Sequence, residues 1–450
     1  MKHTRFLFIV VLLIGGLILT ACAQPAPTSQ SAQAPAAKAT EAPKAAAEAA
    51  KVTEAPKAAA ARTATIGFTA SQTGSLNVEG TRQINGLNLC IEQVNAAGGI
   101  KLADGSMAKL QAKFYDDESK KERVQELYTK LINDDKADFL ISPYSSGLAD
   151  AAAVIAEQNG KVMITAGAAS DSTHTKGYNL VFQMYTPASR YLTGAFDLLA
   201  RLAPDAKKVA IIHENDKFST DVSDAAKAYG TGKGFNIVAY EGYDTGTTDF
   251  APFINKIPAD ADAIMGGGHF ADGSTFAKQL FEKASKAKFI ALLVAPPEPK
   301  FSEIGPGAEG VIGPSQWEPQ AKYTAEAAKA AGIAWVGPNG DDFVTTYKAK
   351  YKGEEPSYHS AGGYAACLIL QQAVEKAGAV DTQKVKAALD AMNIMSFFGP
   401  TKFDTAKAHG LQIGHDMVYI QWQKGADGKV AKQVVWPAEG KSADAKYPLR

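Results

Sequence analysis

Apolar and polar positions alternate along this chain in blocks that predict strands and helices in turn. Residues 139–141 form an apolar run that predicts a strand, residues 148–159 follow a helical pattern, and residues 161–165 are apolar again. A strand–helix–strand unit of this kind is the building block of a parallel, doubly wound sheet.

The two strands of this unit end in small, hydroxyl-rich turns, one with Ser145 and Ser146 and the other at residues 166–170. Ligands of open α/β sheets bind at the carboxyl ends of the strands. Open amides and a helix N-terminus there attract an anionic group such as a carboxylate. In a plainer interpretation, Ser145 or Ser146 only caps the helix.

The same alternation continues along the chain and predicts a largely parallel sheet in an α/β fold. We expect strands at residues 63–70, 110–115, 209–213, 236–241, 263–266, 289–294, 311–315, 417–423 and about 430–435. We expect helices at residues 80–97, 121–134, 219–230, 250–256, 274–284, 341–352, 360–377 and 382–392, with a further one starting at Ser189. Two alternating series with late returns indicate two similar lobes that the chain crosses more than once.

The N-terminal part predicts export. Residues 1–21 carry basic residues and then a short apolar run, which is typical of a signal peptide rather than a membrane span. The run ends in Leu-Thr-Ala-Cys22, which resembles a bacterial lipobox and implies cleavage before Cys22 and acylation of that cysteine. A plain secretory signal with an incidental cysteine is the alternative. Residues 22–62 are rich in Ala, Pro, Lys and Glu, which predicts a disordered tether with a reach of about 35 Å.

Composition narrows the possible partners. The formal net charge is zero, which gives no reason to expect nucleic acid as a partner, and 46% of the residues are hydrophobic, which is enough to form hydrophobic cores.

Cys90 and Cys367 lie in helical patterns among apolar neighbours. We expect buried free thiols there rather than a disulfide, although the sequence does not decide the pairing.

Several segments occur in order and at a familiar spacing. They are residues 66–68 (Ile-Gly-Phe), 73–75 (Thr-Gly-Ser), 94–100 (Val-Asn-Ala-Ala-Gly-Gly-Ile), 145–146 (Ser-Ser), 163–168 (Met-Ile-Thr-Ala-Gly-Ala), 209–213 (Val-Ala-Ile-Ile-His), 243–250 and 398–400 (Phe-Gly-Pro). Over about residues 64–436 the chain thereby resembles the leucine/isoleucine/valine-binding-protein family, the type I periplasmic binding proteins of ABC importers.

The resemblance implies two doubly wound, Rossmann-like lobes of the type I periplasmic-binding-protein fold, joined by three crossovers near Pro187, residues 317–319 and residues 397–400. Lobe 1 would comprise residues 63–187 plus 319–397, lobe 2 residues 188–318 plus 398–436, and residues 437–450 would form a C-terminal tail. Ligand would lie between the lobes, and the form closed by a hinge motion would engage an ABC permease.

The resemblance also implies a site for the ligand's carboxylate on lobe 1. The matching positions are Ser145, Ser146, Ala168 and Ala169. A threonine hydroxyl is usual where this chain has Ala169, so one donor is missing, and Ser170 is a possible replacement.

Other positions match ligand-contacting positions of the family, and each has an alternative role. Glu79 would accept a hydrogen bond from an amide or ammonium group of the ligand, or it would be an exposed charge in a loop. Phe218 would cover the ligand or pack in its own lobe, and His269 would hydrogen-bond the ligand or lie in a polar loop. Glu298 lies near the family's ammonium-binding acid, although prolines around it blur the register. Trp317 would form a cleft wall or anchor the hinge.

No enzyme is indicated. Residues 266–271 fit a loose GxGxxA pattern, but the acidic residue expected at the end of the next strand is missing, because residues 289–295 contain none. His213 and Glu214 lack a second histidine at metal spacing, and there is no GxSxG or CxxC motif. We expect no catalytic residue, no cofactor and no metal.

These features together predict an extracytoplasmic solute-binding lipoprotein of an ABC importer, anchored in the cell envelope and monomeric. Its ligand would be a small amino-acid-like or amide-bearing carboxylate. A ligand-sensing receptor of the same fold, which reports to a membrane signalling protein, is the alternative.

Overall fold

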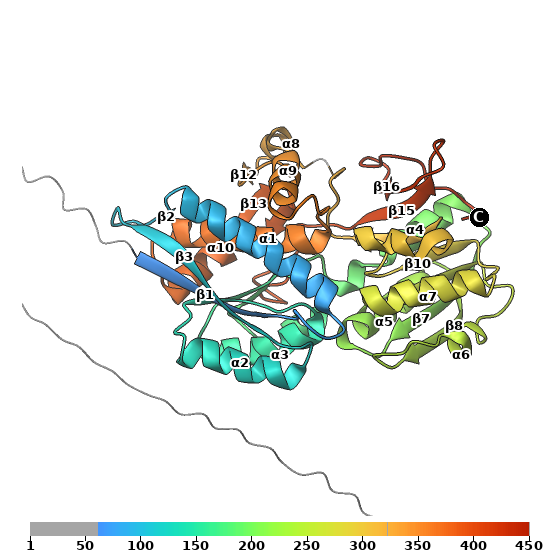
Figure 1. The fold of residues 1–450 in the computed structure, drawn as a ribbon, viewed down its shortest axis with the longest axis horizontal. Helices are drawn as coiled ribbons and strands as arrows, with labels where there is room; N and C mark the ends of the chain where they lie inside the picture. Colours follow the sequence, from blue (N-terminus) through green and yellow to red (C-terminus); the bar gives the residue numbers. More distant parts are fainter. Residues whose placement is uncertain (1–61, 322, 450) are drawn as a thin grey trace, which may run out of the picture. The chain divides into compact units, whose positions relative to one another are not determined.

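The computed structural model describes residues 62–321 and 323–449 (Figure 1). The predicted signal peptide, Cys22 and all of the predicted tether except Arg62 lie outside these residues. Within the described part, no helix combines the length and the apolar character that crossing a membrane requires.

The first sheet has six strands in the order β2-β3-β1-β4-β5-β6. Its strands are β1 (Arg62–Ala70), β2 (Ile100–Lys101), β3 (Met107–Asp116), β4 (Phe139–Ile141), β5 (Met163–Thr165) and β6 (Val181–Gln183). All pairs are parallel except β2 with β3. Helices α1 (Asn77–Ala96), α2 (Lys121–Asn133) and α3 (Ser146–Gln158) connect them.

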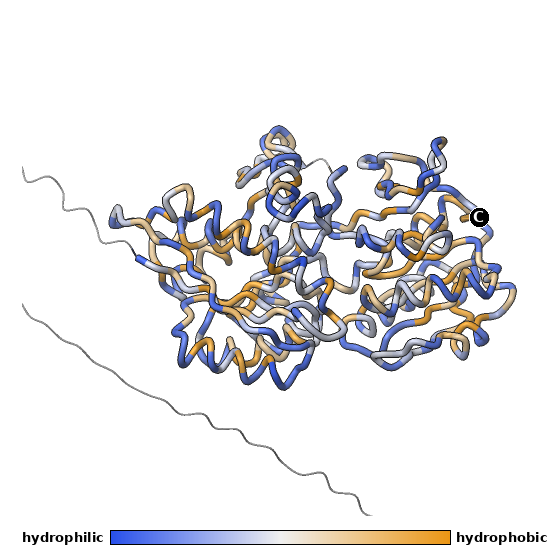
Figure 2. The backbone as a smooth tube through the Cα atoms, in the orientation of Figure 1, coloured by the Kyte–Doolittle hydropathy of each residue, from blue (hydrophilic) through white to orange (hydrophobic). Residues whose placement is uncertain are grey.

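Side chains of this sheet alternate between two cores, because successive residues of a strand point to opposite faces. In β4, Phe139 and Ile141 join one buried cluster, whereas Leu140 joins another with residues of α2 and α3. Both faces are therefore covered, and hydrophobic positions run along the strands and recur along the helices (Figure 2).

The second sheet has seven strands in the order β16-β15-β11-β10-β9-β7-β8. Its strands are β7 (Lys208–Glu214), β8 (Asn236–Tyr243), β9 (Ala263–Gly267), β10 (Phe289–Leu292), β11 (Ile312–Ser315), β15 (Val418–Lys424) and β16 (Val430–Trp436). β15 pairs antiparallel with both β11 and β16, and all other pairs of this sheet are parallel. Its helices are α4 (Thr193–Leu202), α5 (Lys217–Gly232), α6 (Ala251–Ile254) and α7 (Phe270–Glu282), with 3-10 segments η2 (Ala188–Arg190) and η3 (Pro299–Ala308) at its margins.

A third, small sheet has the order β12-β13-β14. It consists of β12 (Ala334–Trp335), β13 (Asn393–Ser396) and β14 (Gly399–Lys402), and it is accompanied by α8 (Ala325–Ala330), α9 (Gly340–Lys350), α10 (Tyr358–Ala377) and α11 (Thr382–Asp390). The sequence did not indicate these strands, because two to four residues are too few to show an alternation. The 3-10 segment η1 (Asp171–Thr175) follows β5.

The chain passes from the first sheet to the second after β6 and returns after β11, since α10 packs along α1 of the first lobe. It crosses again between β14 and β15. Two α/β lobes with repeated crossings confirm the predicted fold class. The residue boundaries assigned to the lobes and the tail stay predictions.

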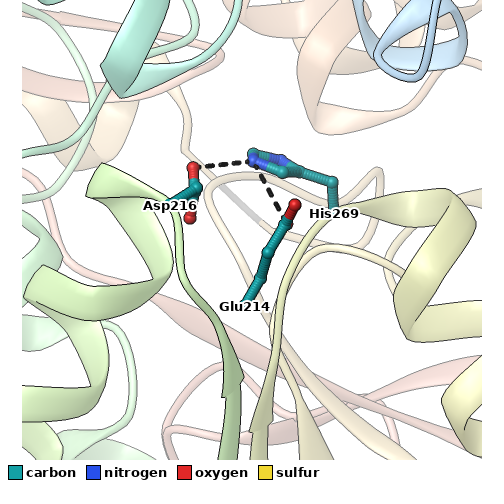
Figure 3. Close-up of side chains that lie close together, drawn as sticks. All are labelled: Glu214, Asp216 and His269. Carbon is teal, nitrogen blue, oxygen red and sulfur yellow. Dashed lines mark hydrogen bonds and ion pairs between the residues drawn. The ribbon is translucent and has the colours of Figure 1, made fainter. Parts of the chain in front are cut away.

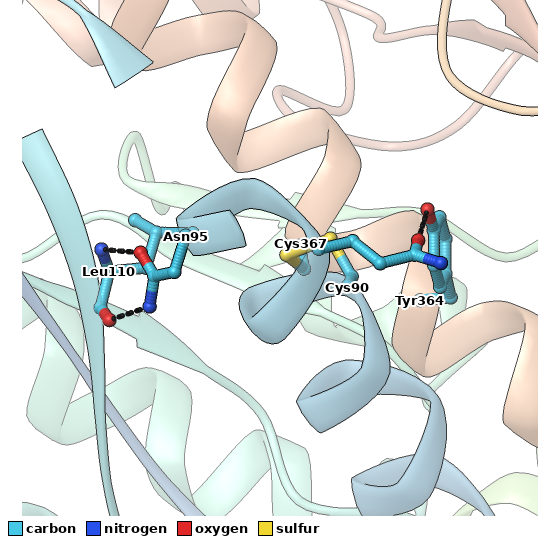
Figure 4. Close-up of a disulfide and its surroundings, with 6 residues drawn as sticks. Cys90, Asn95, Leu110, Tyr364 and Cys367 are labelled. Carbon is cyan, nitrogen blue, oxygen red and sulfur yellow. Dashed lines mark hydrogen bonds between the residues drawn. A yellow bond between two sulfur atoms is a disulfide. The ribbon is translucent and has the colours of Figure 1, made fainter. Parts of the chain in front are cut away.

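The prediction of free thiols is wrong. Cys90 of α1 and Cys367 of α10 form a disulfide with their Cα atoms 6.1 Å apart (Figure 4). This separation lies within the usual range for disulfides. The apolar surroundings suggested buried thiols, but the sequence offered no sign that helices 277 residues apart pack side by side.

Candidate functional site between the lobes

The turns that follow four strands meet between the lobes. On lobe 1 they are the turns after β4 and β5, and on lobe 2 the turns after β7 and β9. Each is a carboxyl end of a parallel strand, which is the edge where open sheets bind ligands. The turn after β4 leads into α3, and those after β7 and β9 lead into α5 and α7.

On lobe 1, the two predicted turns touch each other. The Ser146 hydroxyl accepts a hydrogen bond from the Ala169 amide at 3.1 Å. Ser145 occupies the N-cap position of α3, but its side chain makes no capping hydrogen bond. The Ser170 hydroxyl donates to Asp221 of α5. The serine turn therefore holds the second turn in place, while the first amides of α3 have no intrahelical partner.

Besides the bond between Ser170 and Asp221, further polar contacts join the lobes directly. The Tyr144 hydroxyl lies 2.8 Å from His269 Nδ1, and the backbone amide of Phe270 donates to Glu79 Oε1 at 2.9 Å. Glu79 belongs to the first turn of α1, whereas His269 and Phe270 begin α7. The structure thus brings Glu79 and His269 together at the interface, although they are 190 residues apart in sequence.

The interface has an unusual charge balance. Burial raises the pKa of Glu79, because no water remains to solvate its charge. Burial alone would lower the pKa of His269, but Asp216, Glu214 and Glu79 outweigh it and raise the pKa to about 10. In the absence of a bound metal ion, this pKa makes His269 an imidazolium at neutral pH, surrounded by carboxyl groups of both lobes.

A small cavity lies between these turns. Its lining residues are Tyr144, Ser145, Ser146, Gly167, Ala169, Tyr185, Tyr191, Phe218, His269, Val294 and Tyr358. The volume of this cavity is about 10 Å³, which is enough for about one water molecule. The lining combines two serines at the start of α3 with several aromatic residues. His269 also lines a second cavity of about 140 Å³.

The predicted site residues divide into two groups. Ser145, Ser146, Ala169, Phe218 and His269 line the small cavity. Ala168 is buried next to it. Phe218 also packs edge-on against Tyr191, with ring centroids 5.0 Å apart, while its contact with a ligand stays a prediction.

Glu79, Glu298 and Trp317 are not among the residues that line this cavity. Glu298 is fully buried, with Oε1 2.5 Å from His359 Nδ1 and Oε2 3.7 Å from Arg82 Nε. Burial would raise the pKa of Glu298, but His359 and Arg82 together hold it below its ordinary value. Trp317 packs edge-on against the rings of Phe343 and Phe397, as a hinge anchor would. Contacts of any predicted residue with a ligand stay predictions.

Sequence reasoning missed several lining residues. Tyr144 could have been predicted, because it lies in the same turn as Ser145 and Ser146, and this turn follows the carboxyl end of β4. Tyr185 and Tyr191 flank the first crossover, where position alone hints at the cleft. Tyr358 begins α10, and no local pattern connects it to the site.

Comparison with known proteins identifies the class. The family model described as "Periplasmic binding protein" matches residues 63–429, and the chain belongs to that family. Among curated relatives, the Leucine-, isoleucine-, valine-, threonine-, and alanine-binding protein of Pseudomonas aeruginosa is 25% identical over 374 residues, which cover 81% of this chain and 91% of the relative. The Leu/Ile/Val-binding protein homolog 8 of Brucella abortus is also 25% identical, and the match covers 83% of this chain and 91% of that protein. The resemblance found in the sequence is thereby confirmed.

Solved structures show the same fold. The branched-chain amino acid transporter substrate binding protein LivJ from Streptococcus pneumoniae, in complex with isoleucine, superposes with a TM-score of 0.68 at 24% identity, covering 84% of this chain and 100% of that one. A solute binding protein of an ABC transporter from R. palustris, in complex with benzoate, gives a TM-score of 0.66 at 21% identity, covering 85% and 97%. Proteins of this fold thus occur with an aliphatic amino acid and with an aromatic acid.

Proposed function

We propose that this protein is the extracytoplasmic solute receptor of an ABC importer and binds a small carboxylate in the cleft between its lobes. Family membership supports the class. The ligand class rests on one observation, the pairing of a serine-bearing helix start with a wall of aromatic rings in a single cavity.

The carboxylate would lie against the start of α3. The first amides of a helix and its dipole favour an anion, and the hydroxyls of Ser145 and Ser146 are next to them. The apolar body of the solute would pack against the rings of Tyr185, Tyr191 and Phe218. Both an amino acid and a benzoate-like acid have this combination of an anionic end and an apolar body.

Binding requires hinge movement, because the cavity of the closed form is smaller than any such solute. The solute would enter with the lobes apart, displace part of the contact between Tyr144 and His269, and then hold the lobes around it. A permease would recognise this liganded form. Acylation of Cys22 and the tether at residues 22–62 would keep the receptor, as a monomer, on the membrane.

Isothermal titration against a panel of branched-chain amino acids, other amino acids, small amides and hydroxylated benzoates tests the proposal. We expect one chemical group of the panel to bind in a 1:1 ratio. Ser146→Ala should weaken that binding about tenfold or more, because a hydrogen bond to a charged group is worth about 1.5–3 kcal/mol.

Ser302→Ala is the matched control, since Ser302 is exposed on η3 and lies outside the cavity lining. It should leave the affinity unchanged. A protein that binds no member of the panel would contradict the proposed ligand class, and equal affinities of the Ser146→Ala variant and the parent would contradict the position of the carboxylate.

A further inference from the structure

Three potential metal ligands converge at the carboxyl ends of two neighbouring strands (Figure 3). Glu214 ends β7, Asp216 caps the helix that follows it, and His269 comes just after β9. β7 and β9 are paired in parallel, with His213 opposite Gly267, so the two strand ends lie side by side. One ligand atom from each of the three residues lies within 4.8 Å of the other two.

The distances are close to those of a coordination sphere. His269 Nε2 lies 3.1 Å from Asp216 Oδ2 and 4.0 Å from Glu214 Oε2. Zinc bonds of about 2.0–2.1 Å in a tetrahedron place neighbouring ligand atoms about 3.4 Å apart. The two observed separations fall on either side of this value, so a small movement of the Glu214 side chain would complete the arrangement.

Glu214 supplies an independent sign of a missing partner. Its side chain is 4% exposed, yet Oε2 accepts no hydrogen bond from any group in the described part of the chain. Buried polar atoms of proteins rarely lack a hydrogen-bond partner. The atom points toward His269 in Figure 3. Space beside it is kept by Gly268, where a Cβ would lie 2.4 Å from both Glu214 Oε2 and Asp272 Oδ2.

The other two ligand atoms are held in place by second partners. The Ser219 amide donates to Asp216 Oδ1 at 2.7 Å, which leaves Oδ2 directed at His269. The Tyr144 hydroxyl contacts His269 Nδ1 at 2.8 Å, which leaves Nε2 directed at the carboxylates. Metal-binding histidines characteristically use their second ring nitrogen in this way.

We propose that Glu214, Asp216 and His269 bind a divalent transition-metal ion of the Zn²⁺ type. One imidazole nitrogen and two carboxylate oxygens suit such an ion better than Ca²⁺ or Mg²⁺, which prefer oxygen ligands alone. The remaining coordination position would face the 140 Å³ cavity, whose lining includes Ser75, Leu76 and residues 245–248 as well as Glu214 and His269. A water molecule or a donor atom of a solute could occupy it.

The sequence predicted no metal site, because positions 214, 216 and 269 fit no metal-binding spacing. Only the parallel pairing of β7 with β9 brings them together. The site would also report on lobe closure, since Tyr144 belongs to lobe 1 and the three ligands belong to lobe 2. The inference does not depend on which carboxylate the cleft binds.

A bound proton is the competing explanation, because a charged His269 between Asp216 and Glu214 also balances these charges. Titration of the purified, EDTA-treated full chain with ZnCl₂ distinguishes the two. We expect one Zn²⁺ per chain, and at least tenfold weaker binding in each of Glu214→Gln, Asp216→Asn and His269→Gln. Co²⁺ in place of Zn²⁺ should give the strong visible absorption of a four-coordinate site.

Two further variants sharpen the test. Tyr144→Phe removes the partner of His269 Nδ1 but no metal ligand, and should weaken Zn²⁺ binding by about 10–100-fold. Glu282→Gln, which changes an exposed carboxylate of α7, is the matched control for Glu214→Gln and should have no effect. Circular dichroism of each variant confirms that it is folded.

Absence of Zn²⁺ binding by the parent protein would overturn the inference and favour the proton. Binding that survives all three ligand substitutions would overturn it as well, because the ion would then be held elsewhere on the surface. Neither result affects the isothermal titration with carboxylates. The metal site and the proposed ligand class can therefore be refuted independently of each other.

Discussion

At the scale of single residues, His415 shows how the crossovers between the lobes are fixed. Its Nδ1 lies 2.8 Å from the Thr186 hydroxyl, its Nε2 lies 2.9 Å from the Phe398 carbonyl, and its ring stacks on that of Phe398. Thr186 and Phe398 belong to the first and third predicted crossovers. Burial lowers the pKa of His415 to about 4, since neither partner supplies a negative charge.

This histidine should make stability depend on pH. An unfolded chain takes up the proton near pH 6.5, whereas the folded protein resists it until about pH 4. The contribution of His415 to the free energy of unfolding should therefore be nearly constant above about pH 7.5 and should fall by about 2 kcal/mol between pH 7.5 and pH 5. Urea unfolding at the two pH values measures it.

The His415→Gln variant isolates the effect, because glutamine cannot take up a proton. It should lose about 2 kcal/mol less than the parent on acidification. An equal loss in both proteins would show that other groups cause the pH dependence.

The sequence predicted some of the residues that line the cleft but not others. Ser145, Ser146 and Ala169 were found because they follow strands, and a strand end has a fixed place in a parallel sheet. Tyr358 was missed, because it reaches the cleft from the start of a helix far along the chain. The grouping of Glu214 and Asp216 with His269 depends on strand pairing, which no local pattern encodes.

At the scale of elements, the close packing of α1 against α10 is the strongest constraint. A Cβ on Gly86 would lie 1.8 Å from the Ser360 carbonyl oxygen, and a Cβ on Gly363 would lie 2.0 Å from that of Gln83. Backbone therefore meets backbone at both positions. The helices were predicted from their apolar periodicity, but their contact was not, since glycine in a helix gives no periodic signal.

Gly86→Ala should separate the two helices. A methyl group cannot be accommodated against backbone, so we expect a loss of about 1–3 kcal/mol or more in the free energy of unfolding, measured with urea. Gly232→Ala at the end of α5, where no atom lies within 4 Å of the new Cβ, is the matched control. It should be neutral or slightly stabilising, because alanine favours helix. Similar losses in both variants would mean that close packing is not the cause.

Helix starts illustrate where predicted boundaries fail. α5 was expected from Ser219 and begins at Lys217, because Asp216 accepts from the Ser219 amide as an N-cap. α7 was expected from Ser274 and begins at Phe270, where Asp272 accepts from the His269 amide. Both helices thus begin before the segments from which they were predicted, and these starts carry Phe218 and His269 of the cleft.

At the scale of the whole molecule, two α/β lobes were predictable because strands and helices alternate in two long series. Their order in the chain also predicted repeated crossings. The contact between the lobes could not be predicted, since Tyr144 reaches His269, and Phe270 reaches Glu79, only when both lobes are placed.

Glu79→Ala should shift the protein toward an open form. The substitution removes the acceptor of the Phe270 amide, a bond worth about 1 kcal/mol net, so the ratio of closed to open molecules should fall about fivefold. Small-angle X-ray scattering without added solute should show a larger radius of gyration. Glu122→Ala on the exposed side of α2 should leave the radius unchanged. An unchanged radius in the Glu79→Ala variant would mean that this contact does not hold the lobes together.

The Cys90–Cys367 bridge has a practical consequence for making the protein. Disulfides form in oxidising compartments and are kept reduced in the bacterial cytosol. Material expressed in the cytosol without the predicted export signal would therefore carry two thiols where the exported form has a covalent link between α1 and α10. Such a preparation should unfold more readily than the exported protein, and comparisons of affinity or stability are sound only between samples in the same oxidation state.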